Sequence, residues 1–249
     1  MSKTRLDLLV VTRGLAATRH EAQTLIRLGK VYGPGGRLDK PGTAVPRDLE
    51  VRLKEEERYC SRGGYKLESA LEAFALDPSG WVCLDVGAST GGFTDCLLQR
   101  GAARVYALDV GRSLLHEKVR RDPRVTVLEA VNARNFDAST IPEPVDLATV
   151  DVSFISLTLV LPPLLPVLRP GGLLLPMVKP QFELGRERVP RGGVVRREED
   201  RLAAVEKVEA CAAAIGLEIA GRAPSGLKGP KGNQEYFLLL KKPLEGLKA

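Results

Sequence analysis

The sequence predicts an α/β protein in which a doubly wound, mostly parallel sheet follows a small α+β domain. Two observations lead to this prediction. From residue 81 to residue 240, short apolar runs typical of buried strands alternate with segments typical of helices. Residues 1–54 differ in composition, because they hold eleven Lys and Arg against five Asp and Glu, while the whole chain has a net charge of +6. The excess positive charge therefore belongs to the N-terminal segment.

The overall composition is that of a globular protein with an anionic partner. The chain has 249 residues, of which 44% are hydrophobic and 27% charged, and its pI is near 9.2. A basic balance favours nucleic acid as the partner. No apolar run reaches the roughly 20 residues of a membrane span, and the N-terminus lacks the pattern of a signal peptide. We therefore expect a cytoplasmic protein without a membrane partner.

The four cysteines favour neither a metal site nor a disulfide framework. No two of them form a CxxC pair, and the chain has only two histidines. Reduced thiols in a reducing compartment, with no bound metal, are the expected state.

The basic N-terminal segment is expected to form two short helices followed by a small β region. Thr18 and Glu21 have the spacing of a capping box, in which the threonine hydroxyl accepts a helix N–H, and Thr4 and Asp7 have the same spacing. A glycine follows each predicted helix, where the chain can turn into the left-handed conformation. These glycines are Gly14 and Gly29, and strands are expected at residues 31–32 and 49–53.

Basic side chains gather on this two-helix unit. In the second helix an apolar stripe formed by Ala22, Leu25 and Ile26 leaves the opposite, basic face to solvent. The stretch from RLDLL to KPG, residues 5–42, resembles the S4-type RNA-binding module, from which it departs at Tyr32-Gly33. The alternative is an ordinary solvated basic face. The resemblance implies RNA binding by Arg5, Arg13, Arg19, His20, Arg27 and Lys30.

A junction separates the two parts of the chain. The stretch EEERYCSRGGY combines three glutamates with a glycine pair, which marks a boundary, and a helix is expected to resume over residues 66–75. We therefore predict an RNA-binding domain over residues 1–57, a linker over 58–65 and a second domain over 66–249.

The second domain is predicted from alternating strands and helices. Two helices are expected over residues 93–100 and 198–215, and the prolines within residues 157–168 predict a short or broken helix there. In a sheet of this kind, ligands bind at the carboxyl ends of the strands. Seven strands are expected, at residues 81–86, 104–110, 125–128, 145–152, 173–178, 217–222 and 236–240.

The turn after the first of these strands, CLDVGASTGGFTD, is the most informative stretch. Gly87 permits a tight turn, and Gly91 and Gly92 allow the backbone to approach a ligand closely. The spacing is neither GxGxxG nor a Walker loop, which disfavours a dinucleotide or a nucleoside triphosphate. Asp109 ends the second strand, where a carboxylate can accept both hydroxyls of a ribose, and Asn132 follows the third strand. These residues favour a nucleoside ligand over a generic turn with a surface carboxylate.

This loop resembles the DxGxxPGGF loop of FtsJ-like ribose methyltransferases of the class I fold, with Thr90 in place of the proline. The resemblance implies S-adenosylmethionine as cofactor. It further implies that the cofactor-binding residues are Asp85, Gly87, Ser89, Thr90, Gly91, Gly92 and Phe93 at the methionine end, Asp109 and Val110 at the ribose, and Asn132 at the adenine.

FtsJ-like enzymes also carry a Lys-Asp-Lys-Glu tetrad, and this chain matches it in order. The matching residues are Lys66 in SRGGYKLESAL, Asp151 in ATVDVSFIS, Lys179 in LLPMVKPQFE and Glu235 in KGNQEYFLLL. A ribose hydroxyl must lose its proton as the methyl is transferred, and a lysine can take it only if its ammonium is destabilised. We therefore expect Lys179 to be the base, with Lys66 as a like-charged neighbour.

The combination of S4-type module, junction and FtsJ-like domain resembles the TlyA family over nearly the whole chain. That resemblance implies methylation of ribosomal RNA at a cytidine 2′-hydroxyl. It also implies a role of the linker in cofactor binding, where Cys60 stands in place of the more usual valine. Three alternatives remain open: a membrane-active haemolysin, a non-catalytic RNA-binding protein that keeps a methyltransferase fold, and a NAD-dependent oxidoreductase. The loop spacing disfavours the last, and the filled tetrad disfavours the second.

Overall fold

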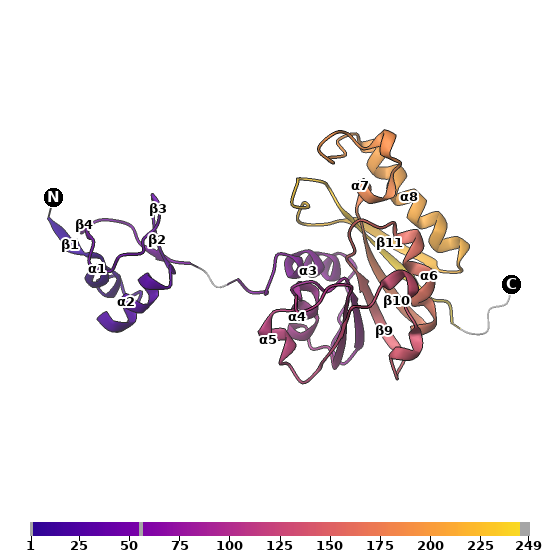
Figure 1. Ribbon diagram of the computed structural model, residues 1–249, viewed down its shortest axis with the longest axis horizontal. Coiled ribbons are helices and arrows are strands. Elements are labelled where there is room, and N and C mark those ends of the chain that lie inside the picture. Colours follow the sequence, from indigo (N-terminus) through magenta and orange to yellow (C-terminus); the bar gives the residue numbers. More distant parts are fainter. Residues whose placement is uncertain (1, 55–56, 245–249) are drawn as a thin grey trace. The chain divides into compact units, whose positions relative to one another are not determined.

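The computed structural model describes residues 2–54 and 57–244, which fall into two compact units, Met1–Arg58 and Tyr59–Ala249 (Figure 1). Each unit has hydrophobic cores of its own, so each is described separately below.

The N-terminal unit packs two helices against short strands. Leu6, Val10 and Ile26 of the helices are fully buried in its core. The helices are α1 (Leu6–Thr12) and α2 (Arg19–Arg27). The strands are β1 (Lys3–Arg5) paired with β4 (Ala44–Pro46), and β3 (Gly36–Arg37), β2 (Val31–Gly33) and β5 (Arg52–Leu53) in a second sheet in that order.

The helix ends of this unit confirm most of the predicted signals. The Thr18 hydroxyl accepts the backbone N–H of Glu21 at 3.1 Å. Gly14 and Gly29 take φ angles of +72° and +68°. The capping box predicted at Thr4 is wrong, because Thr4 lies in β1 opposite Val45 and α1 begins two residues later, at Leu6, without a side-chain cap. Residues 3–5 pair with residues 44–46 as a strand, so the helix cannot begin there.

The second unit contains one seven-stranded sheet in the order β11-β12-β10-β9-β6-β7-β8. The first five strands of the unit form parallel pairs, and β12 runs antiparallel to both β10 and β11. This confirms the predicted mostly parallel sheet. The strands are β6 (Val82–Val86), β7 (Arg104–Asp109), β8 (Val125–Glu129), β9 (Val145–Val150), β10 (Leu168–Val178), β11 (Glu218–Pro224) and β12 (Tyr236–Lys241).

Helices cover both faces of this sheet, as Figure 1 shows. Successive side chains of β6 point to opposite faces of the sheet. Cys83 packs with α3, α4 and α5 on one face, and Leu84 packs with α6 and α8 on the other. The α-helices are α3 (Gly63–Ala73), α4 (Gly92–Gln99), α5 (Glu117–Arg120), α6 (Leu161–Leu164), α7 (Pro180–Glu183) and α8 (Glu198–Ala214), and the 3₁₀ turns are η1 (Ala133–Asn135), η2 (Ala138–Thr140), η3 (Leu157–Leu159), η4 (Leu165–Val167) and η5 (Arg186–Arg188). The segment 157–168 is thus broken, as its prolines predicted.

The main difference from the expected elements lies at the junction. Helix α3 begins at Gly63, three residues before the predicted start, so the C-terminal part of the expected linker is helical. Gly64 lies against the Tyr59 ring so closely that a Cβ there would be 2.2 Å from Tyr59 Cγ. The glycine pair therefore serves close packing within a helix, and it does not interrupt one. Across the described residues, no helix is both long and apolar enough to cross a membrane.

Candidate active site

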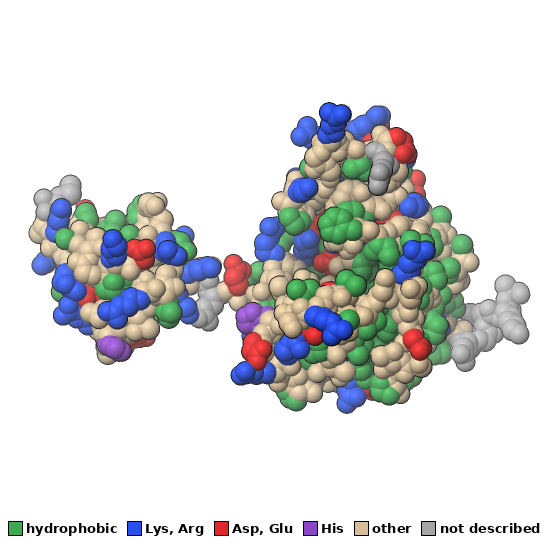
Figure 2. Space-filling model, in the orientation of Figure 1, with side chains coloured by type: hydrophobic (Ala, Val, Ile, Leu, Met, Phe, Trp, Pro, Cys, Tyr) green, Lys and Arg blue, Asp and Glu red, His purple; other side chains and the backbone are tan. Residues whose placement is uncertain are grey.

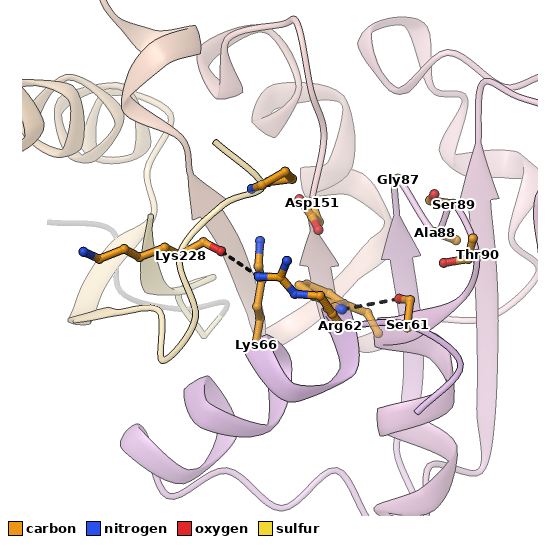
Figure 3. A pocket seen from close by; sticks show the side chains of 13 residues that line it. Ser61, Arg62, Lys66, Gly87, Ala88, Ser89, Thr90, Asp151 and Lys228 are labelled. Atoms are coloured by element: carbon orange, nitrogen blue, oxygen red, sulfur yellow. Dashed lines mark hydrogen bonds between the residues drawn. The ribbon is translucent and has the colours of Figure 1, made fainter. Parts of the chain in front are cut away.

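A cleft opens at the carboxyl ends of β6, β7 and β9. It consists of two adjoining hollows of about 220 Å³ and 430 Å³, which share Gly87, Ser89 and Asp151. Together they have the size of a typical small-molecule site. The first hollow extends toward Lys66 on α3 (Figure 3), and the second toward Asp109 on β7.

Two glycines shape the turn between β6 and α4 that borders this cleft. Gly87 has a φ of +85°, and a Cβ there would lie 2.5 Å from the carbonyl oxygen of Asp151. Gly91 has a φ of +89°, and a Cβ there would lie 2.7 Å from a methyl group of Leu115. Any side chain at either position would therefore separate the loop from the elements around it.

The Asp109 carboxylate organises the loop and also lines the second hollow. One of its oxygens accepts the Ser89 N–H at 2.7 Å, and the other accepts the Gly111 N–H at 2.7 Å. Each carboxylate oxygen has two lone pairs, so both keep acceptor capacity for a ligand hydroxyl. Asp109 can thus hold the turn after β6, residues 87–92 and here called the cofactor loop, and still accept hydrogen bonds from a ligand.

The other predicted cofactor residues are distributed as follows. Asn132 lines the second hollow, and its side-chain oxygen accepts the Arg134 N–H at 3.0 Å, so its NH₂ group is what it can offer to a ligand. Asp85 and Gly91 line neither hollow. The first hollow is lined by Ser89, Thr90, Gly92 and Phe93, and the second by Ser89, Asp109, Val110 and Asn132.

Asp85 supports the loop from below. Its carboxylate is fully buried and accepts the hydroxyls of Thr94 at 2.7 Å and Thr149 at 3.2 Å. Burial raises the pKa of Asp85, the bond from Thr94 opposes this shift and the charge of Asp151 adds to it, so that the pKa lies at about 7.

The four tetrad residues meet as two ion pairs. Lys66 Nζ lies 2.5 Å from Glu235 Oε2, and Lys179 Nζ lies 2.5 Å from Asp151 Oδ1. The Lys179 amine also donates to the Ser153 hydroxyl at 2.9 Å. Lys66 and Asp151 line the first hollow (Figure 3), so each pair presents one member to the cleft.

Lys66 was expected as a like-charged neighbour of Lys179, with Asp151 and Glu235 positioning the lysines, and the structure places one of these carboxylates against each lysine. Each lysine has its own carboxylate, and the side chains are largely buried, with Lys66 exposed by 8%, Lys179 by 9% and Glu235 by 1%. Opposite charges offset the burial of the ammonium groups. The site therefore holds its lysines as neutralised pairs.

The sequence analysis did not single out Phe154, Arg62 or Lys228, which line the two hollows. Phe154 is 90% exposed, has a φ of +64° and lines the second hollow, with its ring 5.0 Å from that of Phe182. Arg62 lines the first hollow and donates to the backbone oxygen of Lys228 at 3.2 Å, as Figure 3 shows. Exposed side chains of this kind leave no periodic signal in a sequence, although Arg62 stands in the RYCSRGG stretch that marked the junction.

The junction residues lie directly on the cofactor loop. The Cys60 N–H donates to Asp95 at 2.9 Å, and its thiol donates to the Thr90 carbonyl oxygen at 3.1 Å. Lys118 reaches the same Asp95 at 3.3 Å. Burial raises the pKa of Cys60 to about 11, so the thiol stays protonated at neutral pH.

In the N-terminal unit, a buried carboxylate positions two of the predicted RNA-binding residues. Asp7 is fully buried and accepts hydrogen bonds from Arg5 at 2.9 Å and Arg19 at 3.0 Å, and the Arg5 guanidinium holds the pKa of this carboxyl below its usual range. The guanidinium groups remain half exposed. Of the other predicted residues, Arg13, His20 and Arg27 are exposed and Lys30 is half-buried.

Two family models match this chain. The FtsJ-like methyltransferase model matches residues 59–242, and the S4 domain model matches residues 4–51. The S4 match thus falls in the first unit and the FtsJ-like match in the second.

Similar proteins extend over nearly the whole length. The chain is 47% identical to the 16S/23S rRNA (cytidine-2′-O)-methyltransferase TlyA of Mycobacterium tuberculosis, over 96% of this chain and 90% of that protein. It is 38% identical to Hemolysin A of Brachyspira hyodysenteriae, over 94% and 98% of the two chains. A solved structure from Streptococcus thermophilus, described as a candidate hemolysin, superposes with a TM-score of 0.74 at 42% identity, covering 98% and 90% of the two chains. The chain therefore belongs to the TlyA family, in which an S4 domain precedes an FtsJ-like methyltransferase domain of the class I fold.

Proposed function

We propose that this protein is an S-adenosylmethionine-dependent methyltransferase of the cytoplasm that methylates ribosomal RNA at a cytidine ribose 2′-hydroxyl. The observation that supports this most directly is the pair of lysine–carboxylate contacts at one cleft of nucleoside size. The relatives named as rRNA methyltransferases support the choice of substrate.

The residues of the second hollow fit a nucleoside. Asp109 offers carboxylate oxygens to two hydroxyls, and Asn132 offers an amide to a base edge. Apolar side chains complete the walls, among them Leu108 of β7 and, in the loops after β8 and β9, Val131 and Ile155. When bound, the cofactor supplies a methyl group that its sulfonium makes electrophilic. Ser89, Gly92 and Phe93 would hold the end that carries this methyl in the first hollow.

In the proposed reaction the buried pairs divide the work. Lys179 accepts the proton of the ribose hydroxyl, and Asp151 and Ser153 orient its amine. Lys66 positions the hydroxyl from the opposite wall and is itself oriented by Glu235. Phe154, held out to solvent beside Asp151, offers a flat apolar face on which a base can stack.

Methyl transfer to purified ribosomal subunits tests this function. Subunits from cells that lack the protein are incubated with it and S-adenosylmethionine, and 2′-O-methyl positions are then mapped. We expect a mark at a cytidine, and Lys179→Met should lower the single-turnover rate by about 10²–10⁴-fold, the usual contribution of a general base, while RNA and cofactor still bind. Lys241→Met, at the opposite end of the sheet on β12, is the control and should keep the wild-type rate. A wild-type protein that marks neither subunit contradicts the function, and a fully active Lys179→Met contradicts the role of Lys179.

A further inference from the structure

Two loops beside the cleft carry a concentration of basic residues that the proposed reaction does not use. The segment of residues 184–197, here called the arginine loop, contains five arginines and one glutamate. The segment of residues 225–234, here called the hairpin loop, joins β11 to β12 and contains two lysines and no acidic residue. Residues 55–249 as a whole have a net charge near zero, so this concentration is local. Figure 2 shows Lys and Arg side chains gathered at the end of the unit near α7 and α8.

Asn233 joins the two loops. Its side chain is only 3% exposed, its amide NH₂ donates to the Gly193 carbonyl oxygen at 2.7 Å, and its side-chain oxygen accepts the Val195 N–H at 2.8 Å. Its backbone oxygen accepts the Gly229 N–H at 2.9 Å, which closes the hairpin loop on itself. A buried amide with both ends satisfied holds the loops as one surface.

This surface begins at the catalytic cleft. Glu235 follows Asn233 by two residues, and its carboxylate lies so close to Gly229 that a Cβ there would be 2.5 Å from Glu235 Oε1. Lys228, in the same loop, lines the first hollow. A strand of RNA whose ribose entered the cleft would therefore pass over these loops.

Several of the charges are available to a ligand. Arg188 forms an ion pair with Asp200, and Arg197 forms one with Glu199. Arg191 and Arg196 are exposed, and no ion pair involves them within the part of the chain that the structure describes. The same holds for Lys228 and Lys231 in the hairpin loop. Unpaired arginines on a surface suit phosphate groups, which accept their hydrogen bonds in pairs.

We propose that the arginine loop and the hairpin loop together form a second RNA-binding surface, which holds the phosphates next to the methylated nucleotide. Asn233 is the positioning residue that keeps the two loops in one surface. The proposal rests on the proposed function, because it takes the substrate to be RNA, and it assigns backbone recognition to the methyltransferase unit in addition to the S4 unit. Phosphate contacts position a nucleic acid without reading its sequence.

Salt-dependent binding of ribosomal RNA to the full-length protein tests the proposal. The probe is ribosomal RNA extracted from cells that lack the protein, and affinity is measured between about 50 and 200 mM salt. Arg191→Gln/Arg196→Gln should weaken binding by about tenfold at low salt. It should also flatten the slope of log affinity against log salt by about 1.4–1.8, because each lost phosphate contact removes about 0.7–0.9. The matched control is Arg104→Gln/Arg169→Gln, which removes the same charge at the other end of the sheet, where these arginines pair with Glu143 and Asp146.

A variant that leaves the charge unchanged distinguishes the contribution of the contact between the loops from the contribution of their charge to RNA binding. Asn233→Ala should weaken RNA binding, because the RNA must then order the two loops, while the salt slope stays at the wild-type value, since the same arginines and lysines contact phosphates in the complex. Cofactor affinity, measured by calorimetry with S-adenosylhomocysteine, should be unchanged in both loop variants, which shows that the cleft is intact.

The outcomes distinguish the two proposals. Wild-type affinity and slope in Arg191→Gln/Arg196→Gln overturn the second surface, as does an equal loss in the control pair. Wild-type affinity in Asn233→Ala overturns the role of Asn233. None of these binding measurements requires methyl transfer, so a protein that binds RNA through the loops but marks no ribose contradicts the proposed function alone.

Discussion

At the scale of single residues, the cleft is organised by carboxylates that differ in their partners. Asp151 and Glu235 each neutralise a lysine, Asp109 accepts backbone N–H groups, and the fully buried Asp85 accepts the hydroxyls of Thr94 and Thr149. The partners decide what each carboxylate can do. An ion-paired carboxylate orients a cation, one bound to backbone holds a loop, and one bound to hydroxyls in a fully buried place favours its protonated form.

The Asp85 carboxyl makes stability depend on pH. In the unfolded chain it loses its proton near pH 4, whereas in the folded protein its pKa is about 7. Between these values the folded state holds a proton that the unfolded state has lost. The free energy of unfolding therefore falls as pH rises, by up to about 1.4 kcal/mol per pH unit, and levels off above pH 7.

Asp85→Asn should remove this dependence, because the amide keeps the shape and can still bond to Thr94 and Thr149. Urea unfolding at about pH 5 and about pH 8 measures it. We expect the wild type to lose stability between the two pH values and the variant to lose roughly a few kcal/mol less. The same loss in both proteins would assign the pH dependence to other groups.

Asp109 is expected to matter for the cofactor more than for the fold. Asp109→Ala removes the acceptor for both ribose hydroxyls and frees the Ser89 and Gly111 N–H groups. Affinity for S-adenosylhomocysteine should fall by about 1–3 kcal/mol in calorimetry, the scale for hydrogen bonds to a charged group. Asp77→Ala, an exposed carboxylate on the loop after α3, is the control. Normal affinity in Asp109→Ala would place the cofactor elsewhere.

The sequence singled out the candidate site residues, but it did not specify which carboxylate meets which lysine. Lys66, Asp151, Lys179 and Glu235 stand out by their order, and the last three also by their positions at predicted strand ends. Whether Lys66 meets Lys179 or Glu235 depends on how α3 packs beside β12, which no local pattern specifies. The exposure of Phe154 likewise depends on the path of a loop between two elements.

At the scale of elements, strands were predicted closely and the starts of elements less so. Apolar runs such as residues 82–86 and 236–241 can only be buried strands in this alternation. Helix α3 was predicted to begin at Lys66, because glycine usually disfavours helices, yet it begins at Gly63. The packing of Tyr59 against Gly64 outweighs that propensity, and such a contact is visible only in three dimensions.

The same close packing predicts the effect of a side chain at Gly92, the first residue of α4. A Cβ there would lie 2.2 Å from Ser61 Oγ and 2.9 Å from the Gly64 nitrogen, so α4 and the start of α3 would have to separate. Gly92→Ala should therefore lower the melting temperature and weaken cofactor binding, because the first hollow lies between these elements.

Thermal unfolding and calorimetry measure both effects. Gly35→Ala is the matched control, since a Cβ at Gly35 meets nothing within 4 Å. A Gly92→Ala protein with wild-type melting temperature and cofactor affinity would mean that α3 and α4 adjust at no cost.

At the scale of the whole molecule, charge and chemistry are divided between the two units. Residues 1–54 carry the net positive charge of the chain, and the unit from Tyr59 onward carries the cleft. The sequence analysis predicted this division because it rests on composition, which needs no knowledge of contacts. It did not predict the basic loops beside the cleft, because acidic residues elsewhere in the same unit bring the net charge of residues 55–249 close to zero.

Removal of residues 1–54 tests this division of labour. The truncated protein keeps Tyr59 and Cys60, which belong to the second unit and contact its loop. RNA affinity should fall and its salt dependence should become flatter, because fewer phosphates are neutralised. Two binding surfaces on one chain raise each other's effective concentration, so the loss should exceed that of any single basic residue. Affinity for S-adenosylhomocysteine should stay close to the wild-type value, since every residue that lines the cleft remains. Undiminished RNA affinity in the truncated protein would assign RNA binding to the methyltransferase unit alone, and a loss of cofactor affinity would show that the S4 unit supports the cleft.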